Sequence, residues 1–181
     1  MTERLIFKHS WSARNDVADM LQGVFVGELL APSTTIWLVS PWISDISVID
    51  NTTGTFDGLG DPDWGQRHVR LAEVLGHVLA NGGHVSVATR PDSHNDLFLD
   101  RLDRQVNAAS KTRLTVSRRE ELHEKGLLGD HYHVGGSMNF TYGGITMLDE
   151  AVRITTNPNA IAQARLEYHS RWGGRLSRDA G

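Results

Sequence analysis

Five polar side chains of selected types lie close together towards the C-terminal end of the chain. The stretch His123-Glu-Lys125-Gly-Leu-Leu-Gly-Asp130 is followed, after five residues, by Gly136-Ser137-Met-Asn139. Two short neighbouring segments therefore carry an imidazole, an ammonium, a carboxylate, a hydroxyl and a carboxamide. This set of groups can attack, hold and neutralise a phosphodiester without a metal ion.

Phosphodiester chemistry predicts a separate role for each of the main groups. A neutral imidazole such as that of His123 is not repelled by an anionic diester, so it can attack phosphorus and form a phosphohistidine. A second imidazole must then protonate the leaving oxygen and later activate water. Lys125 and Asn139 can donate hydrogen bonds to the non-bridging oxygens as negative charge develops there. An offset of two residues in a strand would place His123 and Lys125 on the same face.

Three further polar residues have roles that the pattern leaves more open. Ser137 adds a hydroxyl donor or fixes the turn. Glu150 is expected to bond the far ring nitrogen of His123 and so set its tautomer and orientation. Asp130 either takes part in the chemistry or serves the turn and a structural salt bridge. The candidate catalytic residues are thus His123, Lys125, Asn139, Asp130 and Glu150, and the candidate substrate-binding residues are Ser137, Lys125 and Asn139.

The elements that must position these groups alternate between strands and helices. Short apolar runs predict strands at 35–39, 84–89, 113–117, 122–128, 132–134 and 151–155. Apolar residues at helical spacing predict helices at about 15–30, 69–79 and 97–106, and a last helix that follows Asn157-Pro158. The polar stretch 44–67 predicts a long loop insertion. This alternation favours a layered α/β fold.

Length and composition bound the class of protein. A chain of 181 residues, 39% hydrophobic and with a net charge of -4, predicts a single globular domain over residues 1–181. The absence of cysteine and of a long apolar or leader-like segment predicts a cytoplasmic protein with no membrane contact. Positive charge gathers only locally, between Arg101 and Arg119, where it forms either a nucleic-acid contact or a solvated helix face.

Other residues suggest functions that their spacing does not support well. His131 and His133 lack a third metal ligand of obvious geometry, and Asp57, Asp61 and Asp63 lack the glycine and terminal glutamate of an EF-hand. We therefore expect no metal site. Trp42 and Trp64 flank the stretch 44–67 and either pack against the domain or stack on a base.

The spacing H-x-K-x4-D followed by G-S-x-N resembles the HKD motif of the phospholipase D superfamily. The resemblance extends to Val39-Ser-Pro-Trp-Ile-Ser-Asp45, to residues 84–90 and to the stretch from Gly136 to Glu150, so it covers most of residues 15–173. It implies an αβα sandwich with a mixed central sheet, one HKD motif per chain and no cofactor. The five residues between Asp130 and Gly136 are a departure, because many members have six.

The resemblance also has consequences for assembly and substrate. The active site of the family uses two such motifs, whereas this chain has one, which implies a homodimer in which the two copies of His123 share a site. Small single-motif members include bacterial endonucleases that need no metal. The resemblance therefore implies a metal-independent phosphodiesterase that cleaves nucleic acid, with DNA as the expected substrate.

A narrower resemblance rests on the stretch Ser40-Pro-Trp-Ile-Ser-Asp45 followed by Val48-Ile-Asp-Asn51. It is similar to phospholipase-D-like proteins encoded with bacterial systems that place 7-deazaguanine derivatives in DNA and restrict foreign DNA. This similarity implies a part in phage defence and contacts with other proteins of such a system. Two alternatives stay open: a non-cleaving nucleic-acid-binding subunit of a modification or restriction complex, and a phospholipase or phosphatidyl transferase.

Overall fold

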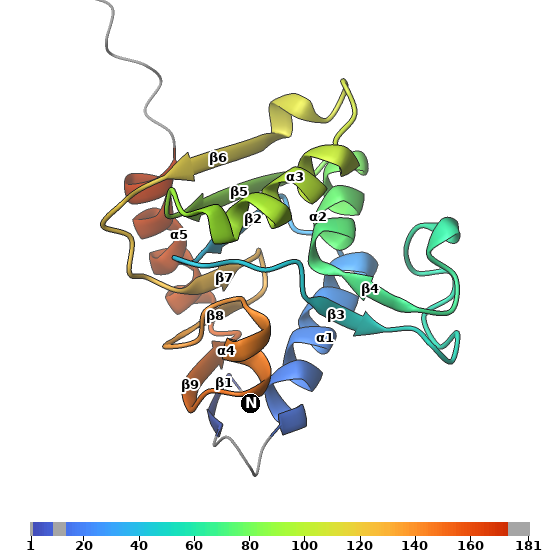
Figure 1. Ribbon diagram of the computed structural model, residues 1–181. Helices are drawn as coiled ribbons and strands as arrows, with labels where there is room; N and C mark the ends of the chain where they lie inside the picture. The colour runs from blue at the N-terminus through green and yellow to red at the C-terminus, as the bar shows by residue number, and fades with distance from the viewer. Residues whose placement is uncertain (1, 9–13, 174–181) are drawn as a thin grey trace, which may run out of the picture.

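The computed structural model describes residues 2–8 and 14–173, and its centre is a seven-stranded mixed sheet. The strands lie in the order β1-β9-β8-β7-β2-β5-β6 (Figure 1). β2, β5 and β6 are parallel, whereas all other neighbouring pairs are antiparallel. The strand bounds are β1 (Glu3–Lys8), β2 (Thr35–Val39), β5 (His84–Thr89), β6 (Leu114–Arg118), β7 (Gly126–Leu128), β8 (His133–Gly136) and β9 (Glu150–Thr155).

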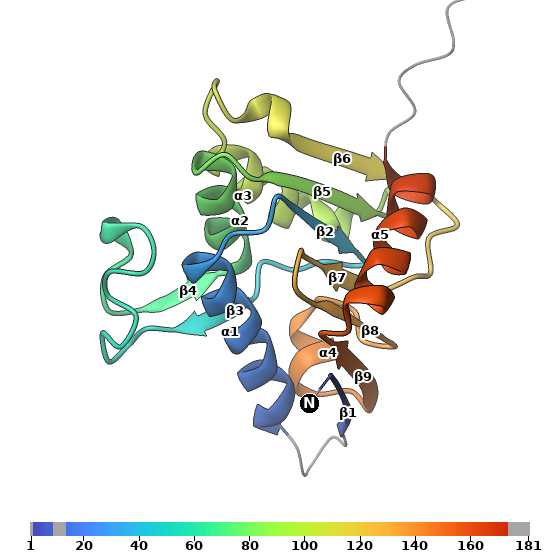
Figure 2. The same cartoon turned by 180° about the vertical axis from the view of Figure 1, so that it is seen from behind.

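Helices cover both faces of this sheet, which confirms the αβα sandwich that the resemblance implies. One face carries α1 (Arg14–Leu30), α2 (Leu71–Ala80), α3 (Asp96–Gln105) and the short α4 (Tyr142–Thr146). The other face carries α5 (Pro158–Trp172), which lies in front of the sheet in Figure 2.

Central strand β2 shows why two helical layers form. Its side chains alternate between the faces. Ile36 and Leu38 are buried against the α1 side, and Trp37 and Val39 are buried against α5. A strand that is apolar on both sides must be covered twice, so the continuous apolar run of the sequence is itself the cause of the sandwich.

The polar stretch 44–67 contains more regular structure than the sequence suggests. Its first part forms β3 (Ser47–Asp50), which pairs antiparallel with β4 (His68–Arg70) in a separate two-stranded sheet. This arm projects from the domain in both views (Figures 1 and 2). Asn51 closes its base by donating to Asp57 Oδ1 and the Gly65 carbonyl at 2.7 and 2.9 Å. The tip includes a short 3-10 turn, Pro62–Trp64.

Two other elements differ from the prediction. The sequence does not predict β1, because its short Leu5-Ile6-Phe7 run gains its stability from pairing with β9 over six residues. The strand predicted at 122–128 begins only at Gly126. His123 and Lys125 therefore lie in an irregular segment before β7. The expected alternation of side chains along a strand does not determine the faces on which these two residues lie.

The topology brings one end of every strand in the large sheet to a common edge. Five strands end there, namely β1, β2, β5, β6 and β8, and two strands begin there, β7 and β9. The register shows this, because Val39 pairs with Gly126, Gly126 pairs with Gly135, and Gly136 pairs with Val152. We call this the motif edge; it contains residues 123–126, 136–139 and 150, together with Ser40 and Arg90. The other end of the sheet is the turn edge, which contains the β7–β8 turn.

Candidate active site

His123 lies at the motif edge with its side chain exposed. The neighbouring Leu122 is buried in the core beneath α5 and anchors the irregular segment. Lys125 bends back so that Nζ donates to the His123 carbonyl at 2.7 Å. The ammonium therefore lies beside the histidine and retains two further N–H groups for a ligand.

Arg90, directly after β5, is the nearest charged neighbour of the imidazole. Its Nη2 lies 3.1 Å from Nδ1 and 3.0 Å from Nε2 of His123. Its Nε donates to the Leu122 carbonyl at 2.9 Å, and its guanidinium lies over the Trp42 ring at 5.2 Å from the centroid. Sequence reasoning did not select Arg90. A signal was available, because an arginine that follows a buried parallel strand lies at the edge where ligands usually bind.

Asn139 is oriented for donation by a contact with Ser40, the residue directly after β2. Its Oδ1 lies 3.2 Å from the hydroxyl of the buried Ser40, which also donates to the Trp42 carbonyl at 2.9 Å. The Asn139 carbonyl oxygen is thereby occupied. Within residues 2–8 and 14–173 its amide nitrogen has no hydrogen-bond partner, so both amide hydrogens remain available to a phosphate oxygen.

Ser137 and Glu150 form a compact pair where β8 ends and β9 begins. The Ser137 hydroxyl donates to Glu150 Oε2 and accepts from the Ala151 amide at 3.0 Å. Gly136 makes this approach possible, because a Cβ on this residue would lie 2.0 Å from the Ala151 carbonyl oxygen and its φ is 140°. Glu150 makes no hydrogen bond with His123 among the described residues; it bonds Ser137 instead of the predicted imidazole.

Lys8 adds a buried ammonium next to Glu150. It is the register partner of Glu150 in the β1–β9 pair, and its Nζ donates to the Gly144 carbonyl at 2.8 Å. Burial lowers the pKa of Lys8, and the charges of Glu150 and Asp149 partly offset that effect. Glu150 thus bonds the Ser137 hydroxyl, and its charge acts on the buried Lys8 ammonium without a direct ion pair among the described residues.

Asp130 lies at the turn edge, away from the other motif residues. Its Oδ1 lies 2.9 Å from Arg165 Nη2 on α5, and its Oδ2 accepts from the Thr34 amide at 2.7 Å. Its own amide donates to the Ser33 hydroxyl at 2.8 Å. The structure therefore places His123, Lys125, Ser137, Asn139 and Glu150 at the same end of the sheet. Asp130 lies at the other end, and its contacts fit the alternative in which it serves the turn and a structural salt bridge.

Three of the residues considered for metal binding, Asp57, Asp61 and His133, make other contacts. No group of three or more potential protein ligands is close enough to hold a metal ion within the described part of the chain. Asp57 accepts from Asn51, and Asp61 caps the 3-10 turn of the arm. His133 lies 3.4 Å from Tyr168 Oη, and burial lowers its pKa.

Comparison with known proteins identifies the fold. No protein-family model and no curated protein matches the sequence. Among solved structures, Nuc from Salmonella typhimurium, a phospholipase D family member, is similar with a TM-score of 0.61 and 13% identity over 98% of this chain and 99% of Nuc. NucT from Helicobacter pylori has a TM-score of 0.58 and 12% identity over 93% of both chains.

A third solved structure belongs to a DNA-binding protein. TrmBL2, an archaeal chromatin protein, has a TM-score of 0.54 and 10% identity over 96% of this chain and 52% of its own. At such identities the likeness establishes the phospholipase D-like fold.

No helix among the described residues is long and apolar enough to cross a membrane.

Proposed function

We propose that this chain is a phospholipase D superfamily phosphodiesterase that cleaves nucleic acid, with DNA as its substrate. The observation that carries the proposal is the convergence of His123, Lys125 and Asn139 at the motif edge of a phospholipase D-like sheet. An exposed imidazole and two hydrogen-bond donors are the groups that a metal-independent attack on phosphorus requires.

The proposed reaction has two balanced steps. In the first, a lone pair on the His123 ring attacks phosphorus, a P–N bond forms, and the bond to the leaving oxygen breaks as that oxygen takes a proton. In the second, water attacks the phosphohistidine, the P–N bond breaks, and the proton of water returns to the acid that gave up the first one. Lys125 and Asn139 bind the non-bridging oxygens in both steps.

The acid in this scheme is the His123 imidazole of a second copy of the chain. Each copy supplies one motif, so we propose a homodimer in which one imidazole is the nucleophile and the other the acid. In a mixture of equal parts native and His123→Ala chains, assembled together at random, only about a quarter of the dimers keep both imidazoles. Activity per total protein should then fall to about a quarter, whereas independent sites would retain about half.

The extent of the fold likeness matches small proteins such as Nuc and NucT better than a longer lipid synthase, which supports the nucleic-acid reading. The chain covers nearly all of Nuc and NucT, whereas it spans only 38% of a similar phosphatidylserine synthase. Hydrolysis of phospholipid vesicles without hydrolysis of any nucleic acid would favour the lipid alternative.

The primary test is a cleavage assay in EDTA on single-stranded DNA, duplex DNA and RNA. The native chain should cut at least one of them, and His123→Ala should lose at least about 1,000-fold of that rate because the nucleophile is gone. Since His123 is exposed, the variant should keep the native melting temperature. A native chain that cuts no nucleic acid would contradict the proposal.

The likeness to TrmBL2 favours one alternative, a DNA-binding subunit that does not cut. In that case the native chain would bind DNA in EDTA with steep salt dependence and leave it intact.

The stretch Ser40–Asp45 supports a narrower proposal about the substrate. Trp42 lies with the Arg90 guanidinium over its ring, and we propose that its indole contacts a base near the scissile diester. We propose that the DNA belongs to a system that marks or restricts DNA through 7-deazaguanine bases. Matched duplexes with and without such bases should be cleaved at different rates, and equal rates would remove this part of the proposal.

A further inference from the structure

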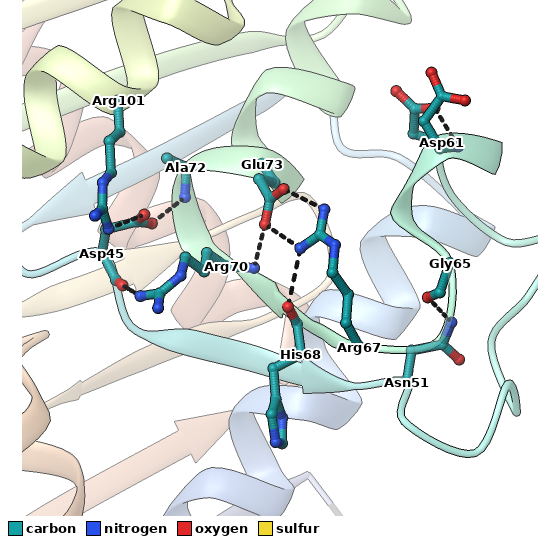
Figure 3. Close-up of polar contacts among 11 residues, drawn as sticks. Asp45, Asn51, Asp61, Gly65, Arg67, His68, Arg70, Ala72, Glu73 and Arg101 are labelled. Atoms are coloured by element: carbon teal, nitrogen blue, oxygen red, sulfur yellow. Dashed lines mark hydrogen bonds and ion pairs between the residues drawn. The ribbon is translucent and has the colours of Figure 1, made fainter.

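A pocket lined by arginines lies where the β3–β4 arm meets α3. Its volume is about 290 Å³, and its charged lining consists of Arg67, Arg70, Arg101 and Arg104 with the carboxylates of Asp45 and Glu73. Figure 3 shows most of these side chains converging from three segments of the chain. None of them belongs to the site around His123.

The buried carboxylate of Asp45 organises two of these arginines. Its Oδ1 accepts from the Ala72 amide at 2.9 Å, and its Oδ2 accepts from Arg101 Nη1 at 3.0 Å. The Asp45 carbonyl accepts from Arg70 Nη1 at 2.8 Å (Figure 3). Each guanidinium has five N–H donors and uses only one in these contacts, so the remaining donors are positioned in advance for an anion.

The pocket carries more positive charge than its carboxylates neutralise. Arg67 and Glu73 form a two-pronged pair at 2.9 and 2.5 Å and balance each other. Arg101 is balanced by Asp45. Arg70 and Arg104 form no ion pair among the described residues, so the lining keeps an excess of two positive charges in a chain whose net charge is -4.

A single short segment connects this pocket to the motif edge. Ser40 contacts Asn139 at one end, and Asp45 lies in the pocket at the other. Five extended residues span at most about 18 Å, which is on the order of five nucleotides at about 3.4 Å each. Between these ends Ile43 is buried while Trp42 and Ser44 are half exposed. The indole N–H donates to Asp92 Oδ2 at 3.0 Å and the Ser44 hydroxyl lies 2.9 Å from His94 Nε2, so the outward side of the segment offers a partly exposed indole ring.

We propose that the arginine pocket is a second phosphate-binding site, which holds a backbone phosphate of a nucleic-acid strand whose scissile diester lies at His123. The strand follows the segment Ser40–Asp45, passes Trp42 and ends with a phosphate at Arg70, Arg101 and Arg104. This assignment rests on the proposed function, because it takes the ligand of the motif edge to be nucleic acid.

The test measures binding separately from cleavage. His123→Ala protein in EDTA is titrated into fluorescein-labelled oligothymidines of three and twelve nucleotides, and anisotropy is recorded between about 50 and 200 mM salt. The longer strand should bind at least about 10-fold more tightly, because only it reaches both sites. Arg104→Glu should weaken binding of the twelve-mer about 10-fold and lower the slope of log K against log salt by about 0.7, which corresponds to one lost contact with a single strand.

Two further variants complete the design. Lys111→Glu makes the same charge change at another exposed cation of the basic segment outside the pocket, and it should alter binding less than twofold. Arg70→Gln removes a charge but keeps a donor for the Asp45 carbonyl, so it tests the pocket if Arg104→Glu does not fold. Equal effects of Arg104→Glu and Lys111→Glu, or equal affinities for the two oligothymidines, would overturn the proposal.

Failure of the proposed function gives a different pattern. If the chain with native His123 cuts no nucleic acid but the length and arginine dependence are present, the second phosphate site stands and the cleavage proposal falls. If the native chain cuts DNA but Arg104→Glu binds the twelve-mer normally, the cleavage proposal stands and the second site falls.

Discussion

The two edges of the central sheet carry similar polar groups and use them differently. At the motif edge, Lys125 bonds only a backbone carbonyl, and the Asn139 amide nitrogen has no partner among the described residues. At the turn edge, Glu28 is buried and accepts from both the amide and the hydroxyl of Ser33, at 2.8 and 2.6 Å. The Ser33 hydroxyl in turn accepts from the amide of Asp130.

The two edges lie far apart, so residues that belong to one motif in the sequence, such as Lys125 and Asp130, are separated in space. β7 has only three residues between Lys125 and the turn, but at about 3.3 Å per residue they place roughly 10 Å between the two edges. At the motif edge, Lys125 and Asn139 keep N–H groups free for a ligand. At the turn edge, the carboxylates of Glu28 and Asp130 accept hydrogen bonds from groups of the protein itself. The first is suited to a ligand, and the second fastens β2, the β7–β8 turn and α5 to one another.

The largest expected effect separates the edges through Lys125. Lys125→Ala should lower kcat for nucleic-acid cleavage by about 100- to 1,000-fold, because a donor to the developing charge is lost. Its melting temperature should stay close to native, since its one side-chain bond is to an exposed segment. Steady-state kinetics and calorimetry measure both. An unchanged kcat would remove Lys125 from the phosphate site.

Asp130→Ala should show the opposite pattern. Loss of the bonds to Arg165 and the Thr34 amide should lower the free energy of unfolding by about 1–3 kcal/mol. The activity of the protein that remains folded should fall far less than in Lys125→Ala. Urea unfolding and active-fraction assays separate the two quantities. A kcat loss as large as that of Lys125→Ala, without destabilisation, would favour the catalytic alternative for Asp130.

Glu150→Gln should show both patterns in weaker form. The residue lies at the motif edge but bonds Ser137 and faces the buried Lys8, so its role there is to position other groups. We expect about a 10-fold loss of kcat and about 1 kcal/mol of stability. Glu121→Gln, at an exposed position in the segment before β7, makes the same side-chain change away from Ser137 and Lys8 and should change neither quantity.

The smallest expected effect is a pH dependence at His133. Burial, with the charge of Arg153, lowers its pKa in the folded chain, so the unfolded chain takes up the proton first as pH falls below about 6.5. The free energy of unfolding should therefore rise with pH from the lowered pKa up to about 6.5. The gain is about 1.4 kcal/mol for each tenfold difference in proton affinity between the folded and unfolded chains.

Urea titrations between about pH 4.5 and 7.5 measure this slope. His133→Gln should reduce it, whereas His131→Gln, at an exposed position two residues earlier, should leave it as in the native chain. His77, whose pKa is also lowered by burial, adds to the slope in the same direction. Identical slopes for the native chain and His133→Gln would show that another group titrates.

Sequence patterns predicted the central elements well where burial is strong. The run Thr35–Val39 became β2, and the apolar stripe of residues 69–79 became mainly α2. They failed where the stabilising contact is distant in sequence. β1 depends on β9, almost 150 residues away, and the arm at 44–67 depends on pairing between Ser47–Asp50 and His68–Arg70.

The sequence by itself determined the chemical groups, their offsets and the apolar runs that require a helix-covered sheet, since these are properties of local composition. Only the tertiary structure decided which of those groups meet. It separated Asp130 from His123, paired Glu150 with Ser137, and brought Arg90 from another strand onto the imidazole. The physical reason is that strand direction and sheet order, which arise from long-range pairing, decide the edge at which each side chain lies.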